Sequence, residues 1–247
     1  MCCPLRTTLN RMPQLRRHDS FQRNTLDGIC EAWLRNLKGS NAHTTGGMRE
    51  SLNELLEECE RLHGHICPGQ LLGVRMALLG CRLIGLEDPR VSDRKKLLVW
   101  VEIDRCMADA VGAVTGVRLG RRSLKYLDYG KVAATFLNVS EGRAVRILAL
   151  DEARTLADEL FPLVESRKER QMLAYREVYE EKLFKVEPVR INPSEKDMPG
   201  RPRTRVNCEQ CGEGVNDGRE VHDGLGRTVC RPCAFGTYYQ APQDRGT

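Results

Sequence analysis

The chain has few aromatic residues, no long apolar run and only a small excess of one charge. Phe, Trp and Tyr make up 5% of its residues, which argues against a base-stacking surface for single-stranded nucleic acid. The net charge is +5 with acidic residues interspersed throughout, so nucleic acid is the least favoured partner. No apolar run reaches the roughly 18 residues of a membrane-spanning helix, and the basic N-terminus lacks the apolar segment of a secretory signal.

Cysteine, in contrast, is abundant. The chain has 11 cysteines, an odd number, and four of them cluster near the C-terminus. A secreted disulfide scaffold would spread an even number of cysteines along a short chain. The pattern therefore predicts a cytoplasmic protein in which thiolates bind metal.

The strongest motif is a pair of CxxC segments, Cys208 with Cys211 and Cys230 with Cys233. Each such turn presents two sulfurs, and four sulfurs complete a tetrahedral zinc site. Unmetallated thiols are the alternative, but a segment so poor in apolar residues needs the folding energy of a bound metal. Residues 207–240 are predicted to form a zinc ribbon with a structural zinc that docks a protein partner. Its arginines could instead meet phosphate.

Composition divides the rest of the chain into three parts. Residues 1–46 are expected to be a flexible leader, with one short amphipathic helix over 26–37. Residues 47–191 are expected to form the main domain. Residues 192–206 are predicted to be a linker because they are rich in proline, glycine and charge.

Apolar spacing predicts the elements of the first half of the main domain, which are a helix over 51–62, a helix over 70–83, a strand over 96–103 and a helix over 107–114. Ser51 and Glu54 have the spacing of a capping box at the first helix. The second helix is apolar on nearly every side, so we expect it to lie at the centre of the core.

The second half contains three β-like runs joined by tight turns, over 123–126, 131–139 and 143–150. We expect them to form an antiparallel meander that joins the earlier strand in one antiparallel or mixed sheet. With helices packed on one face, the fold class is α+β. Asp151 is expected to cap the next helix. A single long charged helix over 165–185 would suit a solvated face or an arm that contacts a second copy, and so a homodimer.

The segment from His63 to Gly69 concentrates polar chemistry between two apolar helices. Two histidines and Cys67 fall within five residues, and the interleaved glycine and proline bend the backbone. Pro68 suits a first helical position, so Cys67 should lie at a helix N-terminus, where a thiolate is favoured. The segment is either a metal or nucleophile site, or a loop with a buried cysteine. Cys106 falls at a second joint, between a strand and a helix.

Two longer runs, HGHICPGQLLGVRMALLG and VEIDRCMADAVGAVTGVRLGRRSLKYLDYGK, resemble the FmdE family, which is named after formylmethanofuran dehydrogenase. The resemblance covers about residues 48–190, and the trailing ribbon extends it to about 236. It implies an α+β domain followed by a zinc ribbon. It also implies that His65, Cys67 and Cys106 surround one metal, which would be zinc or another divalent ion, with His63 as a neighbouring or alternative ligand.

Two thiolates and one imidazole leave a fourth coordination position open, as in catalytic or ligand-binding zinc sites. Asp109 lies one turn beyond Cys106 and is expected to orient a ligand or accept a proton, with His63 as a second proton carrier. Gln70, Tyr129 and Lys131 are candidates for contacts to the bound ligand.

The dehydrogenase that names this family works at a molybdenum or tungsten pterin held by its other polypeptides. This chain shows neither an iron–sulfur cysteine run nor a pterin site. The sequence therefore predicts a metal-binding accessory or regulatory protein of molybdenum or tungsten metabolism, with a small ligand at the open site. A zinc-dependent enzyme acting at His65, Cys67 and Cys106 is the alternative, and a nucleic-acid-binding ribbon protein is the third interpretation.

Overall fold

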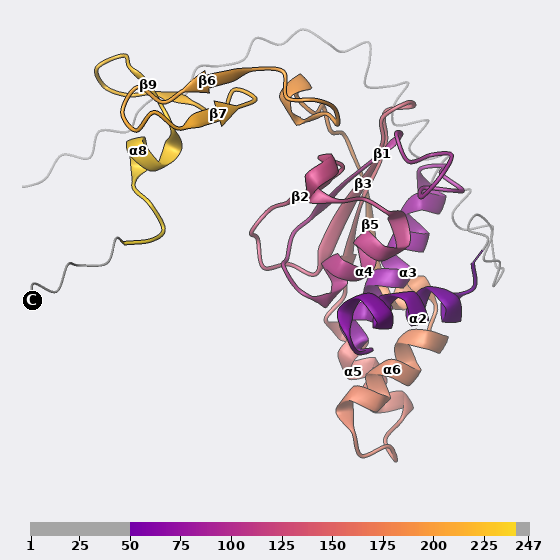
Figure 1. Cartoon of the computed structure of the whole chain (residues 1–247). Helices are drawn as coiled ribbons and strands as arrows, with labels where there is room; N and C mark the ends of the chain where they lie inside the picture. Colours follow the sequence, from indigo (N-terminus) through magenta and orange to yellow (C-terminus); the bar gives the residue numbers. More distant parts are fainter. Residues whose placement is uncertain (1–49, 241–247) are drawn as a thin grey trace, which may run out of the picture. The chain divides into compact units, whose positions relative to one another are not determined.

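The computed structural model describes residues 50–240, so the expected leader and its helix over 26–37 lie outside the described residues. The first domain contains, in chain order, α2 (Leu52–His63), α3 (Pro68–Leu83), β1 (Leu97–Val101), α4 (Cys106–Thr115), η1 (Leu119–Arg121), β2 (Leu124–Tyr126), β3 (Ala133–Asn138), β4 (Arg143–Ala149), α5 (Glu152–Leu160), α6 (Arg167–Glu177), α7 (Glu180–Leu183) and β5 (Phe184–Val189). Figure 1 shows helices packed on one face of a single sheet. The α+β class is confirmed.

Helix α2 begins as its sequence predicts. The Ser51 hydroxyl accepts from the Glu54 N–H at 3.3 Å, and a Glu54 carboxylate oxygen accepts from the Ser51 N–H at 2.6 Å. Both bonds of the capping box are therefore present, which satisfies two N–H groups that no helical carbonyl can reach. The helix ends where Gly64 adopts a left-handed conformation.

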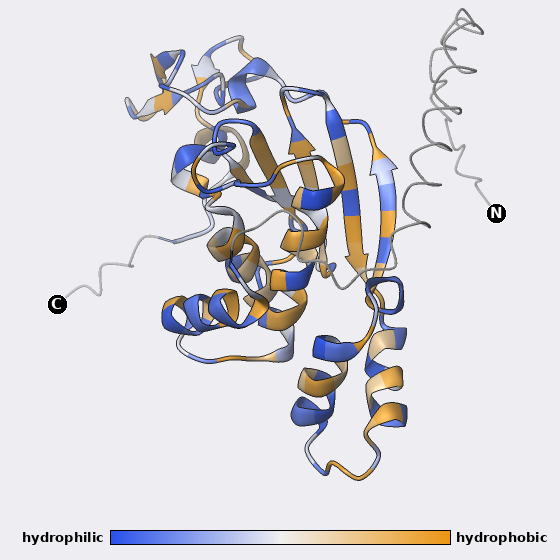
Figure 2. Ribbon diagram, turned by 90° about the vertical axis from the view of Figure 1, so that its right-hand side faces the viewer, coloured by the Kyte–Doolittle hydropathy of each residue, from blue (hydrophilic) through white to orange (hydrophobic). Residues whose placement is uncertain are grey.

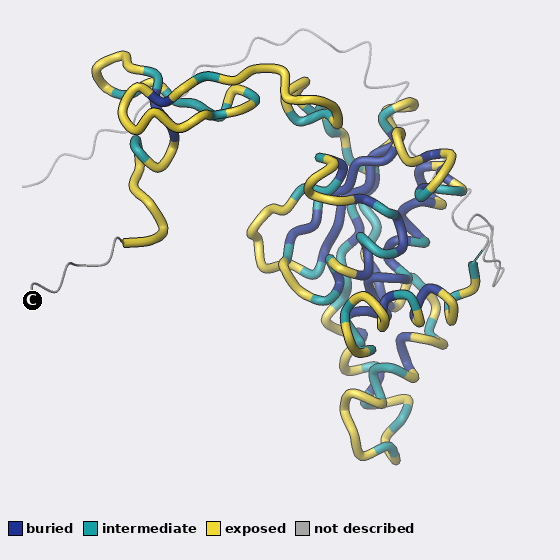
Figure 3. The backbone as a smooth tube through the Cα atoms, viewed as in Figure 1, coloured by how far each residue is buried: buried dark blue, intermediate teal, exposed yellow. Residues whose placement is uncertain are grey.

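Helix α3 is the centre of the core. Pro68 is its first residue, as predicted, and most of its side chains are buried on every side. Two glycines let neighbouring elements approach it. A Cβ on Gly73 would lie 2.7 Å from the Ala110 Cβ of α4, and a Cβ on Gly80 would lie 2.5 Å from the Phe136 ring of β3. In Figure 3 the buried segments include α3 and the central strands.

Replacing Gly73 with alanine is expected to destabilise the domain by about 1–3 kcal/mol, because the new methyl group would force α3 and α4 apart. Chemical denaturation measures this directly. Gly112→Ala in α4 is the matched control, since a Cβ there meets only the Val117 carbonyl at 3.6 Å. That variant should gain about 0.5–1 kcal/mol from helix propensity. Equal effects at the two glycines would contradict the close packing.

The sheet has the strand order β2-β1-β3-β4-β5. Strands β1, β3, β4 and β5 pair antiparallel, but β2 pairs with β1 in parallel. The predicted three-stranded meander was therefore wrong in its first member. The chain crosses from β2 to the far side of β1 before β3 begins, which makes the sheet mixed. Apolar residues recur along these strands (Figure 2).

The expected single helix over 165–185 is also wrong. Helix α6 ends at Glu177, and Val178 and Tyr179 are extended before the short α7. The Arg75 guanidinium of α3 donates to the carbonyls of Tyr175 and Val178 at 2.6 and 2.7 Å. These bonds satisfy carbonyls at the end of α6, and so they stabilise the break.

The start of α5 departs from the prediction in its detail. Asp151 occupies the N-cap position, but its side chain makes no capping hydrogen bond. Within residues 50–240, no helix is both long and apolar enough to cross a membrane.

Candidate functional site: two thiols at facing helix starts and a cluster of four cysteines

The first candidate site lies where α3 and α4 begin. Cys67 is the N-cap residue of α3, and Cys106 is the first residue of α4. A Cβ placed on Gly69 would lie 3.3 Å from the Cys106 Cβ and 3.7 Å from the Cys67 Sγ. The structure therefore brings together two cysteines that are far apart in sequence, and the absence of a side chain at Gly69 leaves room between them.

Local geometry places each cysteine. The turn at Gly64, with φ of 90°, ends α2 and redirects the chain toward Pro68. Cys67 itself is extended, as an N-cap residue is. Arg105 is extended in the same way before α4. Both thiols thus lie beside the positive ends of helices.

The thiol of Cys106 is affected by its surroundings. Burial is the larger influence and the adjoining Cys67 thiol is the next, and together they raise the pKa of Cys106. Two neighbouring thiolates would repel each other, so one remains protonated when no cation is near. A divalent cation reverses this preference because a coordinating thiol is deprotonated. The pair is therefore suited to holding a metal ion.

Gln70 lies directly behind the two cysteines. Its side chain is fully buried, and its Nε2 donates to the Cys106 carbonyl at 3.3 Å. Its Oε1 is also buried, with no hydrogen-bond partner among the described residues. A buried acceptor without a donor is uncommon in folded proteins, and a ligand or an ordered water would satisfy it. This is an observation of the kind expected for a ligand-contacting residue.

His63 and Asp109 form a second contact across the same joint. The His63 Nδ1 and an Asp109 carboxylate oxygen are 2.8 Å apart, linking the end of α2 to the first turn of α4. With the carboxylate as acceptor, Nδ1 carries the proton and Nε2 keeps its lone pair. A histidine held in this way is oriented for proton transfer or for metal ligation.

His65 is exposed, and its ring centroid lies 4.8 Å from that of His63. In the part of the chain that the structure describes, the metal-ligating groups whose atoms all lie within 4.8 Å of one another are the four ribbon cysteines. His65, Cys67 and Cys106 do not form such a group. The structure thus joins the two thiols, and the imidazole lies farther away.

Tyr129 and Lys131 occupy an exposed loop after β2. Their backbone N–H groups donate to the Glu102 carbonyl at 3.3 and 3.1 Å, so the loop is held where β1 ends. Among residues 50–240, no hydrogen bond joins either side chain to the two cysteines.

A buried ion pair at this end of β1 was missing from the sequence prediction. Glu102 is 5% exposed, and its two carboxylate oxygens accept from Arg146 Nε and Nη2 at 2.6 and 2.8 Å. Arg146 also donates to Glu187 at 2.9 Å, and hydrogen bonding to Glu102 raises its pKa. The only signal was an acidic residue at the end of an apolar strand.

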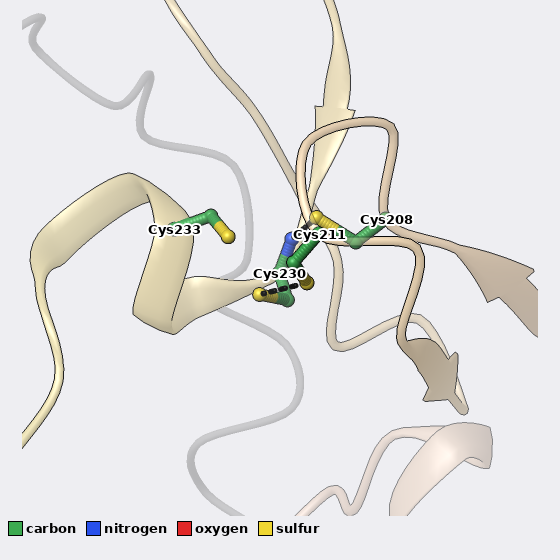
Figure 4. Close-up of side chains that lie close together, drawn as sticks. All are labelled: Cys208, Cys211, Cys230 and Cys233. Carbon is green, nitrogen blue, oxygen red and sulfur yellow. Dashed lines mark hydrogen bonds between the residues drawn. The ribbon is translucent and has the colours of Figure 1, made fainter. Parts of the chain in front are cut away.

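The second candidate site is the cluster of four cysteines in the C-terminal ribbon. The ribbon consists of η2 (Glu195–Asp197) before it, then β6 (Arg205–Asn207), β7 (Gly214–Asn216), β8 (Val221–His222), β9 (Thr228–Val229) and α8 (Arg231–Phe235). Strands β6 with β7 and β8 with β9 form the two short hairpins that the glycines predicted. The four sulfurs all lie within 4.8 Å of one another (Figure 4).

The spacing of these sulfurs suits a tetrahedral metal ion. The Sγ atoms of Cys211 and Cys230 are 3.8 Å apart. Two sulfurs bound to zinc at about 2.3 Å in tetrahedral geometry are separated by about 3.8 Å. Backbone N–H groups, that of Cys211 first and then that of Cys230, lower the pKa of Cys208 to about 6. One thiolate is therefore already stabilised without a cation.

Comparison with known proteins places this chain among relatives. A family profile described as "FmdE, Molybdenum formylmethanofuran dehydrogenase operon" matches residues 62–190. A protein of Archaeoglobus fulgidus, described as a "Probable S-adenosyl-L-methionine-binding protein", is 35% identical over 235 residues, covering 87% of this chain and 60% of the relative. The chain thus spans about 60% of the length of that relative.

One solved structure is similar in fold. It is a crystal structure of an FmdE-like protein of tungsten formylmethanofuran dehydrogenase from Syntrophus aciditrophicus. The TM-score is 0.53 at 21% sequence identity, and the match covers 78% of this chain and 96% of that one. This likeness shows the shared fold.

Proposed function

The chain belongs to the FmdE family, and from that premise we propose that it is a metal-binding accessory or regulatory protein with two different metal sites. The ribbon cysteines hold a structural zinc. His65, Cys67 and Cys106 hold a second divalent metal, whose open position takes a small ligand. The contact between the Cys67 and Cys106 thiols at two helix starts is the observation that carries the proposal.

The residues around the two thiols fit such a group. Two soft sulfur ligands and one imidazole are a donor set that zinc accepts, and they leave one position for a ligand. The unpaired Gln70 Oε1 supplies a hydrogen-bond acceptor beside it. His63, held by Asp109, offers an imidazole nitrogen on the same side. A metal bound here would polarise a ligand, and His63 with Asp109 would accept or deliver its proton.

S-adenosylmethionine is the first ligand to test. The Archaeoglobus relative is described as binding it, and that protein is 35% identical to this chain. Its amino-acid and nucleoside groups carry several donors and acceptors, which a polar site between helix starts can recognise.

The ribbon docks a protein partner in this proposal. Leu225, Phe235 and Tyr238 are 82%, 77% and 100% exposed. Apolar side chains so exposed on a small module are typical of contact surfaces. A homodimer, which the sequence predicts, stays a prediction that sedimentation of the full chain would test.

Metal content tests the proposed pair of sites. The purified chain should contain two metal equivalents, and Cys67→Ala with Cys106→Ala should lower the content to one while the ribbon metal stays. Cys59→Ala is the matched control, because Cys59 is a buried thiol of α2 outside both sites. Two equivalents in the Cys67/Cys106 variant would show that the first site does not exist.

A zinc-dependent enzyme is the second candidate, which the bond between His63 and Asp109 favours. If the site is catalytic, Asp109→Asn should lower turnover of the bound ligand by about 10²–10⁴-fold with metal content unchanged. Mass spectrometry of S-adenosylmethionine incubated with the metal-loaded chain measures that turnover. An unaltered ligand after prolonged incubation would favour the accessory role.

A further inference from the structure

A small cavity lies beside the loop that carries His65 and Cys67. Its volume is about 230 Å³, and its lining residues are Asn53, Leu56, Glu57, Glu60, Ile66 and Arg176. Ile66 is the residue between His65 and Cys67 in sequence, so one wall of the cavity is the segment of the proposed metal site. The other walls come from α2 and α6.

The helix period explains the polar wall on α2. Asn53, Glu57 and Glu60 lie four and then three residues apart, so they share one face of the helix. Leu56, from the same face, is only 4% exposed and forms an apolar floor. The cavity thus has an apolar base and a charged rim.

The charges on the rim are incompletely paired. Among residues 50–240, neither the Glu57 nor the Glu60 carboxylate makes a hydrogen bond or ion pair with its side-chain oxygens. These two like charges are three residues apart, which is unfavourable on a helix. Arg176 of α6 faces them, but its Nη1 donates to the neutral Asn53 amide at 2.6 Å rather than to a carboxylate.

We propose that this cavity binds the amino-acid head of a ligand that carries both an ammonium and a carboxylate group. The ammonium lies between Glu57 and Glu60, and the carboxylate lies on Arg176. The apolar part of the ligand covers Leu56 and Ile66 and continues toward the metal site. In that last respect alone, the inference rests on the proposed function.

Other ligand classes fit the rim less well. An anion would approach two carboxylates, and a divalent cation would approach a guanidinium, so each would meet a repelling charge. A zwitterion pairs with both signs at once. The volume is below the roughly 300–1,000 Å³ of pockets for drug-sized ligands, so the cavity suits the head of a ligand rather than a whole nucleoside.

Calorimetric titration of the full metal-loaded chain with three probes tests the proposal. S-adenosylmethionine and L-methionine both carry the amino-acid head, and both should bind. 5′-Methylthioadenosine keeps the sulfur and the nucleoside but lacks the head, so it should bind at least tenfold more weakly than S-adenosylmethionine. Equal affinity for these two nucleosides would overturn the proposal.

Matched variants assign the binding to the cavity. Glu57→Gln with Glu60→Gln, and separately Arg176→Gln, should each weaken L-methionine binding at least tenfold. Glu181→Gln and Arg190→Gln remove one charge of each sign at exposed positions away from the cavity and should leave binding unchanged. Unaltered binding in the cavity variants would overturn the proposal, with circular dichroism confirming that each variant is folded.

The Cys67→Ala with Cys106→Ala variant separates this inference from the proposed function. If it loses one metal and still binds L-methionine, both the metal site and the cavity are supported. If it keeps two metals but still binds L-methionine, the metal site fails and the cavity stands. If the unaltered chain has two metals and binds neither L-methionine nor S-adenosylmethionine, the cavity proposal fails alone.

Discussion

Removing the metal from the ribbon is expected to unfold residues 205–240 and leave the α+β domain folded. The ribbon has almost no apolar core, since its buried cluster consists of Cys208, Val229 and Cys230. Two of these three are metal ligands. Its strands are two or three residues long, far too short to be stable alone. Structural zinc supplies about 10–16 kcal/mol in comparable small modules, so its loss should exceed any stability the ribbon has.

Amide hydrogen exchange before and after chelation measures this effect. The ribbon amides, including that of Cys230, which donates to the Cys208 sulfur at 3.2 Å, should lose protection completely. The amides of β1 and β3 should keep theirs. Cys230→Ala should reproduce the result without chelator, and Cys81→Ala, which removes a buried thiol of α3, should not. A ribbon that stays protected without metal would contradict the structural role of its four cysteines.

Replacing Arg146 with methionine is expected to destabilise the α+β domain by about 3–5 kcal/mol. The change leaves the Glu102 carboxylate buried without the guanidinium that binds both its oxygens. Removing one partner of a buried ion pair carries this cost because the remaining charge is desolvated and unpaired. Glu102 follows β1 directly, so the end of the strand that leads to Cys106 should also loosen.

Urea denaturation gives the size of the effect. Arg143→Met is the matched control, because Arg143 begins the same strand but its side chain is half exposed and pairs with the exposed Glu141. That variant should change stability by less than about 1 kcal/mol. Adding Glu102→Gln to Arg146→Met should recover part of the loss, since no unpaired charge would remain. A loss below about 1 kcal/mol in Arg146→Met would contradict the account of this pair.

Local signals in the sequence predicted local structure well. The capping box at Ser51, the helix start at Pro68 and the spacing of the ribbon cysteines each depend on residues within a few positions of one another. Such features follow from backbone geometry and need no knowledge of the tertiary fold.

The errors arose where distant residues decide the structure. Nothing near residues 124–126 indicates that β2 pairs in parallel with β1 rather than with β3. The break after α6 is stabilised by Arg75, 100 residues away from Tyr175. Local helix propensity continues through 178–179, so only this tertiary contact accounts for the break.

The candidate site divides in the same way. The sequence identified both cysteines and the resemblance paired them, but the buried bond from Gln70 to the Cys106 carbonyl joins residues 36 positions apart. The cavity depends on Arg176 meeting Asn53, 123 positions away. Neither contact has a local signal, so both required the fold.

A crystal structure of the metal-loaded protein, with anomalous data collected at the metal absorption edge, tests the central claim most directly. The account predicts a peak beside Cys67 and Cys106, with two sulfurs at about 2.3 Å, the His65 nitrogen at about 2.0–2.1 Å and a fourth ligand that is not a protein atom. It also predicts a second peak among the four ribbon cysteines. A ribbon peak with no peak at Cys67 and Cys106, or a first site closed by four protein ligands, would contradict the claim of an open metal site.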